Sequence, residues 1–253
     1  MIARAACMAV TIWLAGVAAH AEAVVAGLSQ DAIAITTNFE GSEILIFGAV
    51  RREAPPPGTA PLEVIITVQG PPRPVTVRRK DRRFGIWVNT DASEIDAAPT
   101  FYAVKTTAPL SVVLSQTEDM RHRVTLDRVI RAVGTGRADQ DLFNAALIRI
   151  RSADGAYQLI EGGVRLREQT LFDTAVRLPA NLTEGEYVTR IFLMRDGAVV
   201  DLYEQTIPVR KVGVERMIYT LAQDRPLIYG LLSLCIAIAA GWMASAVFRA
   251  IRR

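Results

Sequence analysis

The last stretch of the chain, RPLIYGLLSLCIAIAAGWMASAVFRAIRR over residues 225–253, limits its architecture more than any other feature. Residues 226–248 carry no charge, and three arginines follow within five residues. As a helix this segment spans about 34 Å, enough for a hydrocarbon core of about 30 Å. A core helix of a soluble domain is usually shorter and carries a polar face, and one segment without an ionisable residue cannot line a pore alone. The sequence therefore predicts a single transmembrane helix over 226–248.

The charged residues that flank this helix predict its orientation. Arg249, Arg252 and Arg253 follow the apolar segment directly. Because positive residues next to a span stay on the cytoplasmic side, we expect residues 249–253 to form a cytoplasmic tail. Everything before Pro226 would then lie outside the cytoplasm.

The N-terminal stretch MIARAACMAVTIWLAGVAAHA agrees with export. It has one arginine at position 4, an apolar run over 5–17, and the small-x-small triplet Ala19-His20-Ala21. This is the pattern of a secretory signal peptide over 1–21, cut after Ala21. An uncleaved N-terminal anchor is the alternative, although the apolar run is short for a full span.

Charge, cysteine and histidine counts exclude several classes of chemistry. The chain has a net charge of +3, but residues 22–224 hold 24 basic and 26 acidic residues, a net charge of −2. A general polyanion binder is therefore not expected, and nucleic acid is not an expected partner outside the cytoplasm. Cys7 and Cys235 fall in the signal peptide and the span, and His122 is the only histidine left besides His20. We expect no disulfide, no metal and no cofactor in the exported part.

The exported part reads as strands and turns with a helical insert. Short runs rich in Val, Ile, Thr and aromatics, separated by Pro- and Gly-rich breaks, predict a β-sandwich region over 22–115. Two apolar stripes at helical spacing follow, one over 126–133 after the cap Thr125, and one over 143–150 with Asp139 or Asp141 as cap. They place two short helices in the next region, 116–212.

The second β region carries the most specific structural signal. Asp196-Gly197 between two alternating runs predicts a two-residue hairpin turn. Leu182-x-x-Gly185-x-Tyr187 resembles the tyrosine corner of immunoglobulin-like and fibronectin-like sandwiches, although any hairpin with a buried tyrosine could show it. The predicted fold class is mostly β, with one or two Ig-like or fibronectin-like sandwich regions, two short helices between them, a juxtamembrane amphipathic helix over 213–225, and one transmembrane helix. Whether the β part is one domain or two stays open.

Two groups of residues are candidates for contacts with other molecules. The first is the basic run RRKDRRF, which contains Arg78, Arg79, Lys80, Arg82 and Arg83. It is either a solvated hairpin tip or a docking surface for anionic lipid headgroups or an acidic partner protein. The second is the row Ala237, Gly241 and Ser245, whose spacing of four would let a partner helix approach closely. Small residues are also common in spans that have no partner.

Catalytic chemistry has little support in the residues. His122 lies in the polar run 116–125, and the chain has no G-x-S-x-G stretch. The loop GTGRAD lacks the lysine of a phosphate loop, and DASEID at 91–96 lacks the spacing of a calcium loop. We therefore do not expect an enzyme.

Four stretches resemble a family known as "putative transmembrane proteins" of alphaproteobacteria: AITTNFEGSEILIFGAV (34–50), RRKDRRFGIWVNTD (78–91), LFDTAVRLPANLTEGEYVTRIFLMRDG (171–197) and KVGVERMIYTLAQDRPLIYGLLSLCIAIAAGW (211–242). The resemblance implies a cleaved signal, a periplasmic domain and one C-terminal span in the inner membrane. It supplies no catalytic residues, and it implies transporters of the sulfite-exporter type as genomic neighbours. The expected function is an accessory or adaptor protein for an inner-membrane complex, with a transporter as one candidate. A tethered periplasmic solute-binding or sensing domain is the alternative.

Overall fold

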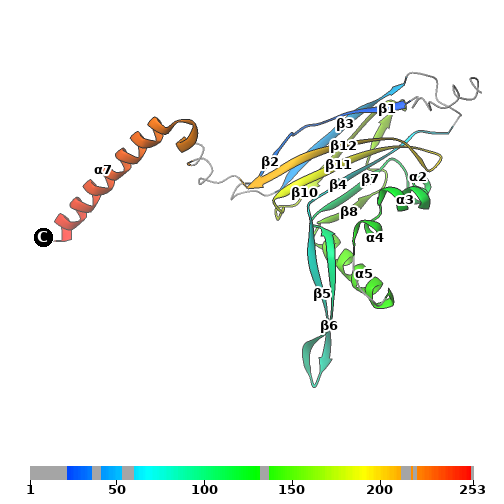
Figure 1. Ribbon diagram of the computed structural model, residues 1–253, viewed down its shortest axis with the longest axis horizontal. Coiled ribbons are helices and arrows are strands. Elements are labelled where there is room, and N and C mark those ends of the chain that lie inside the picture. The colour runs from blue at the N-terminus through cyan, green and yellow to red at the C-terminus, as the bar shows by residue number, and fades with distance from the viewer. Residues whose placement is uncertain are drawn as a thin grey trace, which may run out of the picture. The chain divides into compact units, whose positions relative to one another are not determined.

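The computed structural model of the protein describes residues 22–35, 41–52, 60–131, 137–211, 218 and 221–251 (Figure 1). The chain divides into two units. The first, called the strand unit here, ends at Val209, and the second contains the C-terminal helix. The predicted signal peptide over 1–21 lies outside the described residues.

The strand unit is built on two larger sheets. The four-stranded sheet has the order β1 (Glu22–Leu28), β3 (Ser42–Arg52), β10 (Leu171–Leu178) and β9 (Arg165–Arg167). The six-stranded sheet has the order β2 (Ile33–Ile35), β12 (Ala198–Lys211), β11 (Gly185–Arg195), β4 (Glu63–Gln69), β7 (Tyr102–Thr106) and β8 (Tyr157–Ile160). Both sheets join strands from before and after residue 115. The regions proposed on either side of that boundary therefore share their sheets and do not form two separate sandwiches.

The two sheets and a set of helices form three layers. In β4, every residue from Val64 to Val68 is buried, which requires cover on both faces of the six-stranded sheet. Ile66 of β4 pairs with Lys105 of β7, so the two side chains lie on the same face of the six-stranded sheet. The Lys105 ammonium donates to the Ala175 carbonyl of β10, so this face packs against the four-stranded sheet. The opposite face, which carries Ile65, packs against the helices. The prediction of a mostly β, sandwich-like fold with short helices is confirmed.

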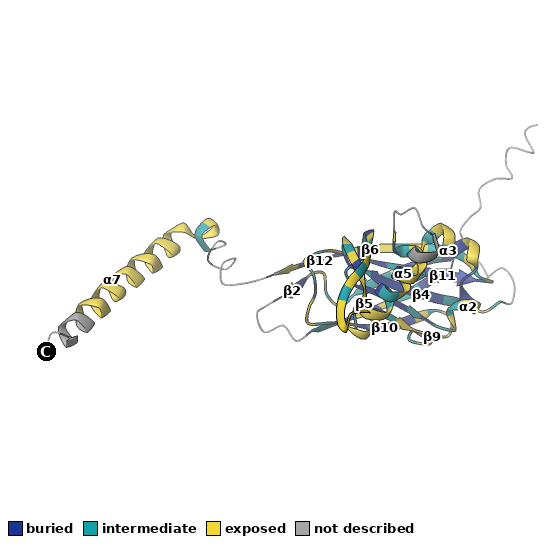
Figure 2. Ribbon diagram, turned by 90° about the horizontal axis from the view of Figure 1, so that it is seen from below, coloured by how far each residue is buried: buried dark blue, intermediate teal, exposed yellow. Residues whose placement is uncertain are grey.

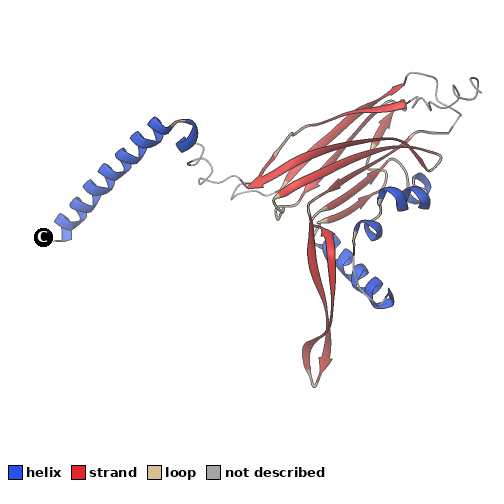
Figure 3. Cartoon of the chain, viewed as in Figure 1, coloured by secondary structure: helices blue, strands red, loops and turns tan. Residues whose placement is uncertain are grey.

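The helices fill the connection between β7 and β8 (Figure 3). They are α2 (Leu110–Val113), α3 (Gln116–His122), α4 (Leu126–Val129) and α5 (Arg137–Ala153). Strands β7 and β8 are parallel neighbours, and parallel neighbours need a long crossover between them. The crossover carries the helices over the outer face of the six-stranded sheet.

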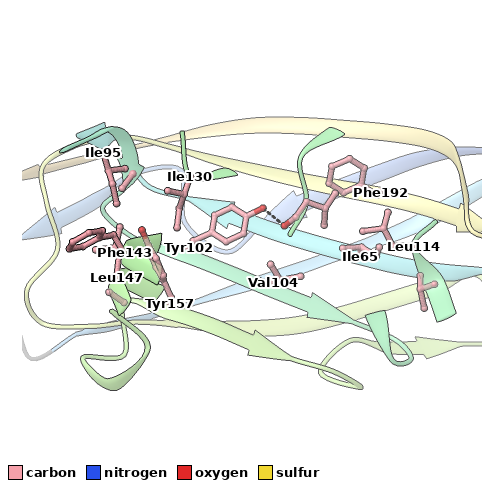
Figure 4. Packing of buried hydrophobic residues seen from close by; sticks show 14 of the residues in the cluster. Ile65, Ile95, Tyr102, Val104, Leu114, Ile130, Phe143, Leu147, Tyr157 and Phe192 are labelled. Carbon is pink, nitrogen blue, oxygen red and sulfur yellow. Dashed lines mark hydrogen bonds between the residues drawn. The ribbon is translucent and has the colours of Figure 1, made fainter. Parts of the chain in front are cut away.

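A buried cluster joins this sheet to the helices (Figure 4). Tyr102 of β7 lies at its centre and donates its hydroxyl to the Val124 carbonyl at 2.7 Å. Burial raises the pKa of Tyr102 to about 12, so the hydroxyl stays a donor at physiological pH. Phe143 and Leu147 of α5 are buried in the same cluster, as their spacing predicted.

The helical insert differs in detail from the prediction. Helix α4 ends at Val129, because Ile130 is extended and Arg131 forms a β-bridge with Ala97. The Thr125 hydroxyl donates to Asp119 at 2.7 Å and makes no cap hydrogen bond. Helix α3 was not predicted. Its N-cap is Ser115, a residue type that favours helix starts, and the Ser115 hydroxyl accepts from the Glu118 amide at 3.4 Å. Asp139 and Asp141 lie inside α5, so neither is its N-cap.

The predicted hairpin between β11 and β12 is present. Asp196 and Gly197 form its two-residue turn with φ of 51° and 73°, as the Asp-Gly pair predicted. At the start of β11 the Tyr187 hydroxyl donates to the Thr183 carbonyl at 3.0 Å, which is the hydrogen bond of a tyrosine corner. The assignment to an immunoglobulin-like or fibronectin-like fold stays a prediction.

The C-terminal helix α7 (Pro226–Ile251) has the properties of a membrane span. Its segment Pro226–Ser245 has a mean hydropathy of 2.0, and its side chains are exposed. Pro226 costs the helix little in the first turn, where its missing N–H would have no intrahelical partner. Of the predicted juxtamembrane helix, residues 221–224 are helical, and most of the remainder lies outside the described residues.

Candidate interaction surfaces

A long hairpin extends from the strand unit. Strands β5 (Pro72–Arg83) and β6 (Ile86–Pro99) form a two-stranded sheet of their own and project away from the two larger sheets (Figure 1). At the base of the hairpin, Val77, Ile95 and Ala98 are buried in the cluster beside the helices. From Arg78 to Trp87 every residue is exposed (Figure 2). We call residues 78–91 the arm.

The tip of the arm is apolar and its backbone is strained. Phe84 and Gly85 form a two-residue turn with φ of 50° and 84°. Such turns favour Asn or Asp before the glycine, and a left-handed backbone costs a bulky residue about 1–2 kcal/mol. Phe84 is nevertheless 106% exposed, and Ile86 and Trp87 are 64% and 69% exposed. The strain is therefore not offset by burial of Phe84 within the described part of the protein.

All five basic residues predicted as a docking surface lie on the arm. Two of them face carboxylates: Arg79 is ion-paired with Asp91, and the Arg83 Nε lies 3.9 Å from an Asp81 oxygen. The arm holds five cations and two carboxylates, a net charge of +3. Since residues 22–224 together carry −2, the rest of that region carries −5. The arm is thus the cationic end of an otherwise acidic domain.

A second surface was missed by the sequence reasoning. The outward face of the four-stranded sheet carries apolar side chains, and the four largest, Val25, Leu45, Phe47 and Leu171, are each more than half exposed. Phe47 lies opposite Gly27 on β1, and a Cβ built on Gly27 would sit 3.3 Å from the Phe47 ring. We call this surface, with the smaller Ala49 and Ala175, the apolar sheet face. The sequence feature that could have revealed this surface is EILIFGAV. Successive residues of a strand point to opposite faces, so this nearly continuous apolar run makes both faces of β3 apolar.

Charged side chains border the apolar sheet face. Glu43 and Arg177 pair across β3 and β10 at 3.6 Å. Arg165 and Arg167 of β9 both pair with Asp173. Asp173 lies within the face, opposite Phe47 and between Leu171 and Ala175 on β10, while the other charges lie at its edges. Apolar side chains with a charged rim are the usual anatomy of a protein interface.

The predicted row on α7 lies on a helix exposed along its described length. Ala237, Gly241 and Ser245 are all exposed, and a Cβ added to Gly241 would meet no atom within 4 Å. The row is therefore sterically open to a neighbouring helix. A helix partner for it stays a prediction.

One buried ion cluster ties the two sheets together. Glu22 of β1 is 1% exposed and Arg195 of β11 is 7% exposed, and the Arg195 Nη2 donates to both Glu22 oxygens at 2.9 and 2.8 Å. Arg52 of β3 adds a third bond from its Nε at 2.7 Å. Burial acts to raise the pKa of Glu22, but the hydrogen bonds and charges of Arg52 and Arg195 outweigh it and lower that pKa. The cluster holds two sheets together and opens onto no described hollow.

His122, the histidine considered for catalysis, has packing partners of its own. Its ring meets Phe192 edge-on with the ring centroids 5.5 Å apart. Its Nε2 lies 3.3 Å from a Glu118 oxygen on the same helix. Within the described residues, no group of three or more His, Cys, Asp or Glu side chains could hold a metal ion.

The described part of the strand unit contains hollows, and two of them are large enough for a small molecule. One, of about 460 Å³, is lined mainly by apolar side chains of the helices and strands, including Val104, Leu110, Leu126, Ile148 and Leu159. The other, of about 500 Å³, lies where β7 and β8 approach β10, and Lys105, Arg165 and Arg177 line it together with Glu43. Both have volumes typical of small-molecule sites.

Comparison with known proteins identifies a family. No curated protein matches the chain. Among solved structures, the sporulation control protein Spo0M from Bacillus subtilis matches with 11% identity over 81% of this chain and 55% of that protein, at a TM-score of 0.27. The chain thus spans about half the length of that protein, and so low a TM-score implies no shared fold or function. The family described as "Putative transmembrane protein" matches residues 23–250. The chain therefore belongs to this transmembrane family, and it is a membrane protein whose described residues include one candidate span, near the C-terminus.

Proposed function

We propose that this protein is a membrane-anchored accessory protein that binds a protein of an inner-membrane complex through the apolar sheet face. In this proposal the strand unit works in the periplasm, and α7 holds it beside its partner. The observation that carries the proposal is the exposed cluster of Val25, Leu45, Phe47 and Leu171 on one sheet face. Soluble monomers rarely expose contiguous apolar patches of this kind unless the patch binds something.

The charges on the rim favour an acidic partner over a second copy of this chain. Three arginines, Arg165, Arg167 and Arg177, stand against the carboxylates of Glu43 and Asp173. These groups hold one more arginine than carboxylates, so a partner with a negative border complements them better than a second copy with the same positive excess. A partner with an apolar patch inside an acidic border would complement the face. A transporter of the sulfite-exporter type is the first partner to test.

Replacing Phe47 with aspartate tests this face. The aromatic ring lies near the centre of the patch, and a buried charge there would oppose any apolar partner. With a photoreactive residue at position 45 of the full chain in native membranes, we expect Phe47→Asp to lower the crosslink yield to an integral membrane protein at least about tenfold. Phe47 is half exposed but pairs across the strands with Asp173, so a second carboxylate there also costs stability, and the uncharged Phe47→Asn should lower the crosslink yield without that cost.

The matched control is Leu142→Asp, because Leu142 is an exposed leucine on α5, away from the apolar sheet face. It should leave the crosslink unchanged. Equal crosslinking in the Phe47 variant and the parent chain would contradict the proposal. A crosslink only to a second copy of the chain would contradict it as well.

The apolar hollow beside the helices favours a second candidate function, a tethered solute-binding domain. Its lining of Val104, Leu110, Leu126, Ile148 and Leu159 suits an apolar or amphiphilic small molecule. A ligand that occupies it should raise the melting temperature of the full chain, and Leu126→Arg should abolish that rise. If no compound in an amphiphile library shifts the melting temperature, this candidate fails.

A further inference from the structure

We propose that the tip of the arm inserts into an anionic lipid surface, so that the protein touches the membrane at two places, the arm and α7. Phe84, Ile86 and Trp87 would enter the headgroup region, and the basic residues behind them would bind lipid phosphates. This contact goes beyond the proposed function, because a partner on the apolar sheet face does not require it.

The apolar tip is the first observation that supports insertion. Within the four residues 84–87, three large apolar side chains are exposed, and the fourth residue is a glycine. Their exposure has a cost in water, and Phe84 also holds a strained backbone. Transfer of the three side chains into an apolar phase would offset both costs. Tryptophan in particular favours the membrane–water interface.

The charges of the arm are the second observation. Arg78, Arg79, Lys80, Arg82 and Arg83 are exposed directly behind the apolar tip. Near an anionic surface each free cation contributes about 1 kcal/mol of attraction. Because the arm carries +3 and the rest of residues 22–224 carries −5, an anionic surface attracts the arm and repels the remainder. The charge distribution therefore directs the tip toward the lipid.

Shape and connectivity favour lipid over a protein as the occupant. A specific protein interface buries about 800 Å² on each partner, and three side chains at a narrow tip provide much less. A bilayer needs no shaped pocket and accepts a convex apolar tip with cations above it. Because α7 is a candidate span of the same chain, anchoring through it would raise the effective concentration of lipid that the arm meets.

Fluorescence of Trp87 tests the proposal in the full chain. The tryptophans are Trp13, Trp87 and Trp242, so Trp13→Phe with Trp242→Phe leaves Trp87 as the single reporter. The chain is reconstituted alone in vesicles of phosphatidylethanolamine with phosphatidylglycerol. We expect brominated lipids to lower Trp87 emission at least about twofold and aqueous iodide to have little effect, since an interfacial tryptophan lies within reach of the acyl chains.

Two variants separate insertion from folding. Asparagine is favoured in this turn, so Phe84→Asn should strengthen the hairpin and still weaken quenching by brominated lipid. Arg82→Glu with Arg83→Glu should also weaken it, most strongly in vesicles that contain phosphatidylglycerol. The same charge change elsewhere, Arg123→Glu with Arg131→Glu, should leave quenching unchanged, because both residues are exposed, lie outside the arm and belong to neither the apolar sheet face nor its rim.

Three results would overturn the proposal. The first is Trp87 emission that iodide quenches and brominated lipid does not, which would mean a solvated tip or a tip that needs a partner protein. The second is protection from both quenchers that grows with the protein-to-lipid ratio, which would mean that a second copy covers the tip. The third is full quenching by brominated lipid in Phe84→Asn. Phe47→Asp should not alter Trp87 quenching, so this proposal and the proposed function can fail separately.

Discussion

Replacement of Glu22 by glutamine is expected to lower the free energy of unfolding by about 3–5 kcal/mol, as breaking a buried ion pair usually does. Glutamine keeps the shape of the side chain but removes its charge, which leaves the buried Arg195 guanidinium without its carboxylate. Arg195 belongs to β11 and Glu22 to β1, so the loss also weakens the contact between the two sheets. Urea unfolding of the full chain in detergent, followed by circular dichroism, measures the effect.

Glu186→Gln is the matched control, because Glu186 is an exposed carboxylate on β11. Its effect should stay within about 0.5 kcal/mol. If both variants unfolded at the same urea concentration, the ion cluster would contribute no net stability. The contact between the sheets would then depend on apolar packing alone.

The same cluster makes stability depend on pH. The pKa of Glu22 is lowered from its ordinary value of 4.5 in the folded protein. Its contribution is therefore fully present above that ordinary pKa and is lost as the pH falls through the lower, folded-state pKa. The parent chain should lose stability below roughly pH 4.5, and Glu22→Gln should lose less over the same range. Melting temperatures measured across acidic pH compare the two slopes.

Introducing two arginines into α7 is expected to remove the chain from the membrane. Leu232 and Ile236 lie one turn apart on the helix and are exposed. Each arginine near the centre of a span costs about 2.5–3.5 kcal/mol, so Leu232→Arg with Ile236→Arg costs about 5–7 kcal/mol. The share of the chain that sediments with washed membranes should fall steeply. Leu232→Ile with Ile236→Leu keeps the apolar character and should behave like the parent.

Integration of the double-arginine chain at the parent level would contradict the assignment of α7 as a span.

The hydrogen bond of one polar residue in the helix, Ser233, also supports that assignment. The Ser233 hydroxyl donates to the Tyr229 carbonyl one turn earlier at 2.9 Å, so it is hydrogen-bonded without water. The arginines would have no such local acceptor at their charged ends.

Local patterns in the sequence predicted the elements whose causes are local. The span follows from the length and composition of one segment, and the turn at Asp196-Gly197 follows from the backbone preference of glycine. Strand pairing is not local. The neighbours β3 and β10 are more than a hundred residues apart, and no short motif marks them as partners. The parallel pair β7 and β8 is likewise visible only after folding, which is why the helices between them read as a simple insert.

The candidate surfaces were predicted only in part, for a related reason. Charge can be read from sequence, so the five cations of the arm were noticed there, and the structure shows all five as exposed. Their role in docking stays a prediction. Apolar strand residues normally face a core, so Phe84, Ile86 and Trp87 read as ordinary strand positions. Only the structure shows that the arm has no third strand and that the outer face of β3 has no covering layer in the described part of the protein. Whether an apolar strand residue is exposed depends on whether another strand or layer covers it, and the pattern of apolar residues within one strand does not show this.

Extraction of native membranes with alkaline carbonate tests the central claim most directly, which is that lipid surrounds α7. Carbonate releases proteins held at a surface by charge or by partner proteins and leaves those with a membrane-spanning helix in the pellet. We expect the full parent chain to remain in the pellet. In a separate extraction, only trace amounts of the double-arginine variant should remain there. Recovery of the intact parent chain in the supernatant would contradict the account.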